Sequence, residues 1–280
     1  MTFTYDGSYE GLMSVVFEAY RLGATVARIQ PEEAHVASLF ETPVHVATDA
    51  AHAARVRKGL VAKTSPRTDK LLHRAFHTER PDVEMRIYRF LRLAFDGRED
   101  PTEHYGHDDV LQLHRLDKQM GREIHRMHAF VRFQKTRDEL YYAVVQPDFN
   151  VLPFLGEHFA DRYADQRWII YDAKRHFGLF YDLEGTRYIT FDETPARQLE
   201  TLSREVITDD EPRFQDLWKT YFKHTNIESR RNLKLHLQHV PKRYWRYLVE
   251  KDGQAKQYTN DWLKAGTQRG IKAANDKDSP

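Results

Sequence analysis

Apolar and polar residues alternate with the period of a β-strand near the middle of the chain. Residues 130–134 are predicted as a strand, on which Phe130, Arg132 and Gln134 share one face. Residues 140–145 are rich in aromatic and β-branched residues and are predicted as a second strand after a polar turn. We expect these two strands to pair as an antiparallel hairpin.

A helix and further strands follow this predicted hairpin. Residues 152–163 carry apolar side chains at helical spacing, and we expect this helix to lie across the sheet. Further strands are predicted at residues 168–171, 178–181 and 187–191. The pattern indicates an α+β fold with a mostly antiparallel sheet of about five strands, covered by helices.

Helical spacing dominates the rest of the chain. Ser8, Asp49 and Ser65 are predicted to cap helices near the N-terminus, where short strands at residues 3–5 and 44–47 are expected to pair. We predict a mainly helical N-terminal region, an antiparallel-sheet core with C-terminal helices, and a polar tail. These three regions comprise residues 5–96, 107–251 and 252–280.

The composition is that of a globular protein with a hydrophobic core. The net charge is close to zero, so any nucleic-acid-binding surface must come from a local concentration of basic residues. Of 280 residues, 40% are hydrophobic, while the formal net charge is only +1. No leader and no apolar window of about eighteen residues is visible, so we expect no membrane contact and a cytoplasmic location. The absence of cysteine excludes thiol nucleophiles and the usual ligation of an iron–sulfur cluster. Walker and GxGxxG motifs are also missing, and we expect no cofactor.

Four long runs of the sequence carry a family resemblance. They are YDGSYEGLMSVVFEAYR, EIHRMHAFVRFQ, YYAVVQPDFNVLPFLGEHFADRYADQRWIIYDAKRHFGLFYD and LWKTYFKHTNIESRRNLKLHLQHVPKRYW. Together they resemble an uncharacterised bacterial family described as probable DNA metabolism proteins. Members stand beside a radical S-adenosylmethionine (radical SAM) protein or are fused to a uracil-DNA glycosylase-like domain. The resemblance implies DNA repair or modification and supplies no reaction and no catalytic residues.

The strongest charge signal that we identify lies in residues 219–246, where Glu228 is the only acid. Basic side chains neutralise phosphates and aromatic rings stack on unpaired bases, so this mixture suits nucleic acid. A solvated helix face with core aromatics would give the same pattern, and we favour binding because the family resemblance points to DNA. The predicted contacts are Arg230, Arg231, Lys234, His239, Lys242, Arg243, Tyr244 and Trp245.

A second set of polar residues flanks the predicted hairpin. His125, His128 and Asp148 are candidate catalytic residues, because histidine exchanges protons near neutral pH and a carboxylate can orient it. Arg132 and Gln134 are candidates for holding a phosphate or a base edge. A buried structural network would account for the same residues, and the sequence leaves both interpretations open.

Other histidines do not amount to a predicted metal site. His104, His107 and Asp108 lack a further strong ligand at a defined spacing. His73 and His77 are one helical turn apart but lack the intervening Glu of a zinc-protease helix. We interpret this pair as structural or exposed.

Two functional hypotheses follow. The first is a DNA-binding accessory protein that presents a lesion or modified base to a radical SAM or glycosylase-type partner. The second is an enzyme that acts on DNA or nucleotides by acid–base chemistry at His125, His128 and Asp148. We also expect Arg132 and Gln134 to meet the basic C-terminal segment around one groove, because the apolar residues of that segment need a surface for burial.

Overall fold

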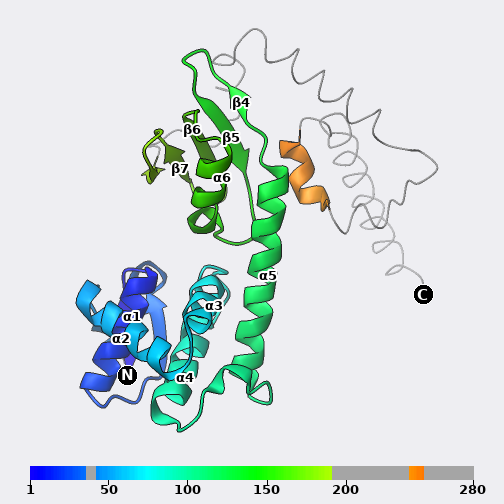
Figure 1. Ribbon diagram of the computed structural model, residues 1–280. Coiled ribbons are helices and arrows are strands. Elements are labelled where there is room, and N and C mark those ends of the chain that lie inside the picture. Colours follow the sequence, from blue (N-terminus) through cyan, green and yellow to red (C-terminus); the bar gives the residue numbers. More distant parts are fainter. Residues whose placement is uncertain (36–41, 191–239, 249–280) are drawn as a thin grey trace, which may run out of the picture. The chain divides into compact units, whose positions relative to one another are not determined.

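The computed structural model describes residues 1–35, 42–190 and 240–248, whose elements are shown in Figure 1. These residues divide into two compact units. The first unit comprises residues 1–123 and 148–151. The second comprises residues 124–147, 152–190 and 240–248. Helix α5 (Asp108–Phe130) contributes to both, because the division falls within it.

The first unit contains a parallel sheet with the strand order β2-β1-β3. Strand β1 (Thr2–Tyr5) lies between β2 (Arg28–Pro31) and β3 (Val44–His45) and runs parallel to both. Helix α1 (Tyr9–Arg21) provides the crossover that a parallel pair needs between β1 and β2. The predicted pairing of the two N-terminal strands is confirmed, whereas the sequence pattern does not reveal β2.

Three further helices pack with this sheet, and their apolar faces form one core. They are α2 (Ala50–Lys63), α3 (Pro66–Phe76) and α4 (Val83–Asp96). Burial of these apolar faces is the main stabilising contribution to the unit. Side chains with no exposed surface include Phe3, Leu12, Leu60, Leu72 and Ile87.

Side-chain caps start three helices of the first unit, α1, α2 and α3, as predicted. The Ser8 hydroxyl accepts a hydrogen bond of 2.9 Å from the Gly11 N–H at the start of α1. Asp49 caps α2 and Ser65 caps α3 in the same way. Each cap satisfies a backbone N–H that no carbonyl within the helix can reach.

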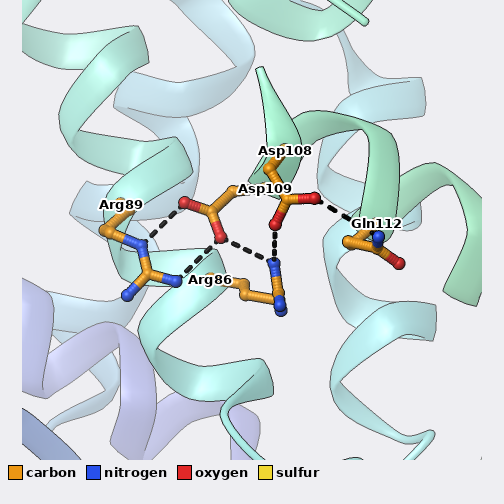
Figure 2. Close-up of polar contacts among 5 residues, drawn as sticks. All are labelled: Arg86, Arg89, Asp108, Asp109 and Gln112. Atoms are coloured by element: carbon orange, nitrogen blue, oxygen red, sulfur yellow. Dashed lines mark hydrogen bonds and ion pairs between the residues drawn. The ribbon is translucent and has the colours of Figure 1, made fainter. Parts of the chain in front are cut away.

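A cluster of ion pairs joins α4 to the first turn of α5 (Figure 2). Asp109, whose side chain is 8% exposed, accepts hydrogen bonds from Nε and Nη2 of Arg89 at 2.7 Å and from Arg86 at 2.9 Å. Arg86 also pairs with the exposed Asp108 at 2.8 Å. The hydrogen bonds from Arg89 hold the pKa of Asp109 below its usual range. Both carboxylates lie at a helix N-terminus, where the helix dipole favours negative charge.

The second unit contains a five-stranded sheet with the order β4-β5-β6-β7-β8. Strands β5 and β6 pair in parallel, and the other neighbours pair antiparallel. The sheet is therefore mixed, which corrects the expectation of a mostly antiparallel sheet. The strands are β4 (Gln134–Lys135), β5 (Tyr141–Val145), β6 (Trp168–Asp172), β7 (Phe177–Tyr181) and β8 (Thr186–Thr190).

The parallel pair follows from the helix between its strands. The chain between β5 and β6 forms a short 3-10 turn, Leu152–Phe154, and helix α6 (Gly156–Arg162). A connection that crosses the sheet through a helix brings the chain back to the edge where it started, so the next strand runs in the same direction. The buried ring of Phe159 packs on Trp168, with 6.1 Å between ring centroids. The prediction that this helix covers a face of the sheet is confirmed.

The predicted strand at residues 130–134 is mostly wrong. Helix α5 continues to Phe130, residues 131–133 have no regular structure, and only the short β4 pairs antiparallel with β5. Arg132 accounts for part of this difference, because its guanidinium donates a hydrogen bond of 2.7 Å to the Ala129 carbonyl. A cation at this position stabilises the C-terminal turn of a helix. Phe130, Arg132 and Gln134 therefore do not share a strand face.

Candidate nucleic-acid interface

Helices α2 and α3 carry a steep local excess of positive charge. Residues 50–80, which contain both helices, include eight Lys and Arg residues and only two carboxylates. The helices pack together and are joined by Thr64 and Ser65 alone. Their basic side chains therefore lie in one part of the first unit. This concentration is absent from our sequence-based expectations, although the charge count that singles out residues 219–246 also reveals it.

Five of the basic side chains on α2 and α3 themselves are exposed, and we call them the α2–α3 basic surface. Within the described ranges, no carboxylate forms an ion pair with any of the five. An exposed cation without a protein counter-ion is available to a phosphate group. The surface consists of Arg55, Lys58, Lys63, Arg67 and Lys70.

The outer face of α2 allows a large ligand to approach closely. Helical spacing places residues 51, 54, 55, 58 and 62 on one side of α2, and all five are exposed. Three of them are alanines, whose side chains end at Cβ. Arg55 and Lys58 are the two long side chains among the five, and the Arg55 guanidinium lies over the Phe17 ring, 5.8 Å from its centroid.

A polar network behind this surface fixes α2 against α3. Arg57 donates a hydrogen bond of 2.7 Å from Nη2 to Asp69, and the buried Tyr9 hydroxyl donates to the same carboxylate at 3.5 Å. The hydrogen bonds with Asp69 raise the pKa of Arg57, and burial raises the pKa of Tyr9. Arg57 therefore stays a cation and Tyr9 a neutral donor at physiological pH.

His73 lies in the last turn of α3 beside this network, and His77 is the C-cap residue of the same helix. Their Nε2 atoms are 3.2 Å apart, and the His73 ring packs on Tyr9 with 4.8 Å between centroids. Burial lowers the pKa of His73, so its imidazole is neutral at physiological pH. Spacing alone predicts that the two rings share a helix face, and the structure adds that their Nε2 atoms meet.

The predicted catalytic residues are divided between the two units. His125 and His128 lie on the part of α5 that belongs to the second unit, and the exposed Asp148 belongs to the first. The backbone N–H of Asp148 donates a hydrogen bond of 3.0 Å to Glu123. The acid–base site therefore stays a prediction.

His128 has a neighbour that the sequence pattern does not reveal. Its ring stacks on His158 of α6, with 3.8 Å between centroids and 15° between the ring planes. Burial, followed by the charges of His158 and His125, lowers the pKa of His128 to about 4. Its Nε2 atom is buried and has no hydrogen-bond partner in the part of the chain that the structure describes. His128 is therefore a neutral imidazole at the contact between two helices.

The two predicted contacts on the hairpin are partly engaged by the protein itself. Arg132 donates to the backbone at the end of α5, as described above, and remains half-buried. Gln134 is half-buried in β4, where it pairs with Tyr142. Neither side chain is fully exposed in the way expected for a primary phosphate contact.

The described C-terminal contacts lie on a 3-10 helix, Lys242–Tyr247. Lys242 and Arg243 are exposed, whereas the rings of Tyr244 and Trp245 are buried, with the Trp245 indole donating to the Val240 carbonyl at 3.0 Å. The buried rings anchor this segment to the second unit and are not presented to a base for stacking. The other predicted contacts, Arg230, Arg231, Lys234 and His239, lie outside the described residues, as does most of the expected groove.

Comparison with known proteins identifies a family. The model of a domain of unknown function, DUF4130, matches residues 81–250. The chain belongs to this family. The α2–α3 basic surface precedes the matched range, so the family match does not account for it. No curated protein and no solved structure matches the chain. No helix among the described residues is long and apolar enough to cross a membrane.

Proposed function

We propose that this protein binds nucleic acid through the α2–α3 basic surface and serves as an accessory protein in DNA repair or modification. The observation that carries the proposal is the set of five exposed cations, without ion-pair partners among the described residues, on two packed helices. A nucleic-acid backbone is a regular array of anions, and each phosphate that a Lys or Arg neutralises releases a counterion into solution. Such binding depends on charge and needs no base-specific contact.

The choice of DNA and of an accessory role rests on the sequence. Four runs of the chain resemble proteins of DNA metabolism, and members of that group stand beside or are fused to partner enzymes. The chain contains no cysteine, so its side chains cannot supply the thiolates of the usual iron–sulfur cluster. We therefore propose that a radical SAM or glycosylase-type partner performs the reaction. The exposed Lys242 and Arg243 are proposed as further phosphate contacts.

Fluorescence anisotropy with labelled single- and double-stranded oligonucleotides tests the binding proposal. The variant Lys58→Gln/Arg67→Gln/Lys70→Gln removes three positive charges from the α2–α3 basic surface. Its affinity at low salt is expected to fall by roughly 10- to 100-fold, because each phosphate contact contributes to the electrostatic part of binding. Binding that is absent in the wild-type protein, or unchanged in the variant, would refute the proposal.

A matched control removes the same charge elsewhere. The variant Arg98→Gln/Arg122→Gln/Arg162→Gln replaces three exposed arginines outside α2 and α3. Its affinity is expected to stay within about twofold of wild type if binding is localised to the α2–α3 basic surface, because a side chain that contacts no phosphate releases no counterion. An equal loss in both variants would mean that net charge alone drives association.

An acid–base enzyme is the second candidate, and the neutral imidazole of the half-buried His128 favours it. A side chain with a pKa of about 4 is unprotonated at neutral pH, which is the form that a general base requires, and it is a weaker base than an ordinary histidine. Turnover of DNA or nucleotides that His128→Gln abolishes, with oligonucleotide affinity unchanged, would support this function. An accessory protein would tolerate the same substitution.

A further inference from the structure

Two histidines at the C-terminal end of α3 are arranged like ligands of a single metal ion: His73 lies in the last turn of the helix and His77 is its C-cap residue. His73 and His77 are one helical turn apart, and their Nε2 atoms are separated by 3.2 Å. In a tetrahedral site with metal–nitrogen bonds of about 2.0–2.1 Å, two ligating nitrogens lie about 3.3 Å from each other. An ion between the two rings therefore needs only a small adjustment of either side chain.

We propose that His73 and His77 bind one divalent transition-metal ion, of the Zn²⁺ or Ni²⁺ kind, through their Nε2 atoms. Imidazole nitrogen is a preferred ligand for these ions, and it ligates in its neutral form. The spacing of four residues is the one that zinc helices use to bring two histidines to one ion.

The charges around the pair are partly compensated. Glu10 and Asp69 favour positive charge at His73, and Arg57 opposes it. Arg57 is held by its ion pair with Asp69 at 2.7 Å, and Asp69 precedes His73 by one turn on the same face of α3. The remaining carboxylate, Glu10, lies on α1, which packs in the same core. A bound dication is thus not surrounded by unpaired positive charge from these groups.

Two protein ligands leave the coordination of the ion open. Among the described residues there is no group of three or more His, Cys, Asp or Glu side chains placed to hold a metal. Zn²⁺ usually takes four ligands, so water or oxygen atoms of an external ligand complete the site. An open site of this kind differs from a closed structural one, because removing the metal is not expected to unfold α3.

The alternative explanation is a simple hydrogen bond between the two rings. A metal-binding measurement distinguishes this explanation from a metal site. Equilibrium dialysis of tag-free protein against Zn²⁺ or Ni²⁺ is expected to give one ion per chain. His73→Asn and His77→Asn are each expected to weaken binding by roughly tenfold or more, since even outer-shell changes cost 10- to 100-fold in metal sites. Electron paramagnetic resonance of the Cu²⁺ form is expected to show coupling to two nitrogen atoms.

A control pair of histidines sharpens the test. His104→Asn/His107→Asn removes two exposed histidines that lie between α4 and α5, and wild-type affinity is expected to remain. Circular dichroism in the presence of a chelator checks that each variant is folded. Wild-type protein that binds no ion, or His73→Asn/His77→Asn protein that binds as tightly as wild type, overturns the proposal. If the double variant does not fold, the nitrogen coupling in the wild-type Cu²⁺ spectrum decides, and coupling to fewer than two nitrogens overturns it.

Discussion

At the scale of single residues, Asp109 is expected to contribute more to stability than any exposed ion pair of the first unit. Its buried carboxylate holds Arg89 and Arg86, so Asp109→Asn leaves two partly exposed cations without their shared partner. We expect a loss of about 1–3 kcal/mol in the free energy of unfolding, less than for a fully buried pair. Urea denaturation measures it. Asp108→Asn, at a side chain that is 70% exposed, is the control and is expected to cost less than about 1 kcal/mol.

The pH dependence of the same residue has a defined sign. Hydrogen bonds from Arg89 lower the pKa of Asp109 in the folded protein. A carboxyl with a depressed folded pKa stabilises the fold fully above its unfolded value of about 3.9, and the contribution is lost as the pH falls through the folded pKa. Below about pH 4, the difference in stability between wild type and Asp109→Asn is therefore expected to shrink. A difference that stays constant down to pH 2 would contradict this assignment.

His128 is expected to act in a different pH window. Burial lowers its pKa to about 4, whereas an unfolded histidine titrates near 6.5. Between about pH 6.5 and pH 4 the unfolded chain takes up a proton that the folded chain does not, so stability falls as the pH is lowered through this window. We expect a decrease of about 1–2 kcal/mol for this partly exposed ring, measured by urea denaturation at pH 7 and pH 4.5. His128→Gln is expected to lose this dependence and His125→Gln to keep it.

At the scale of elements, local patterns predict the helix caps and the pairing of β1 with β3, but neither the parallel pairing of β5 with β6 nor the end of α5. Ser8, Asp49 and Ser65 cap helices as predicted, because a cap depends on residues within one turn. The parallel pairing of β5 and β6 depends on a crossover through α6, which hydrophobic alternation does not encode. The end of α5 was also missed, since the alternation around Arg132 fits a strand while its guanidinium in fact caps the helix.

Helix α6 is short, and its attachment is expected to depend on one aromatic ring. Phe159 is buried and packs against Trp168 and Phe133, with centroid distances of 6.1 Å and 5.7 Å. Phe159→Ala leaves a cavity in this aromatic cluster and is expected to cost about 3–5 kcal/mol. Chemical denaturation measures the loss. Asp161→Ala, an exposed position on the same helix, is expected to change stability by less than about 0.5 kcal/mol.

At the scale of the whole molecule, the candidate site depends on charges that only the fold brings together. The sequence shows which segments are basic, and the structure distinguishes the exposed Lys58 and Lys70 from Arg57, which Asp69 already neutralises. It likewise distinguishes the exposed Arg243 from the buried Tyr244, a difference that composition cannot show. Burial depends on tertiary packing, so the sequence alone could not predict which of the basic and aromatic side chains are exposed.

The salt dependence of binding measures how many of the exposed cations contact phosphates. If all five cations of the α2–α3 basic surface neutralise phosphates of duplex DNA, the logarithm of the association constant falls with the logarithm of salt concentration with a slope of about −4.5. Lys58→Gln removes one such contact, so the slope is expected to become less negative by about 0.9 for any DNA sequence. Arg122→Gln removes an equal charge from α5 and is expected to leave the slope unchanged. Anisotropy titrations between roughly 50 and 200 mM salt measure both slopes. A slope that responds equally to the two substitutions would place the bound phosphates elsewhere on the protein.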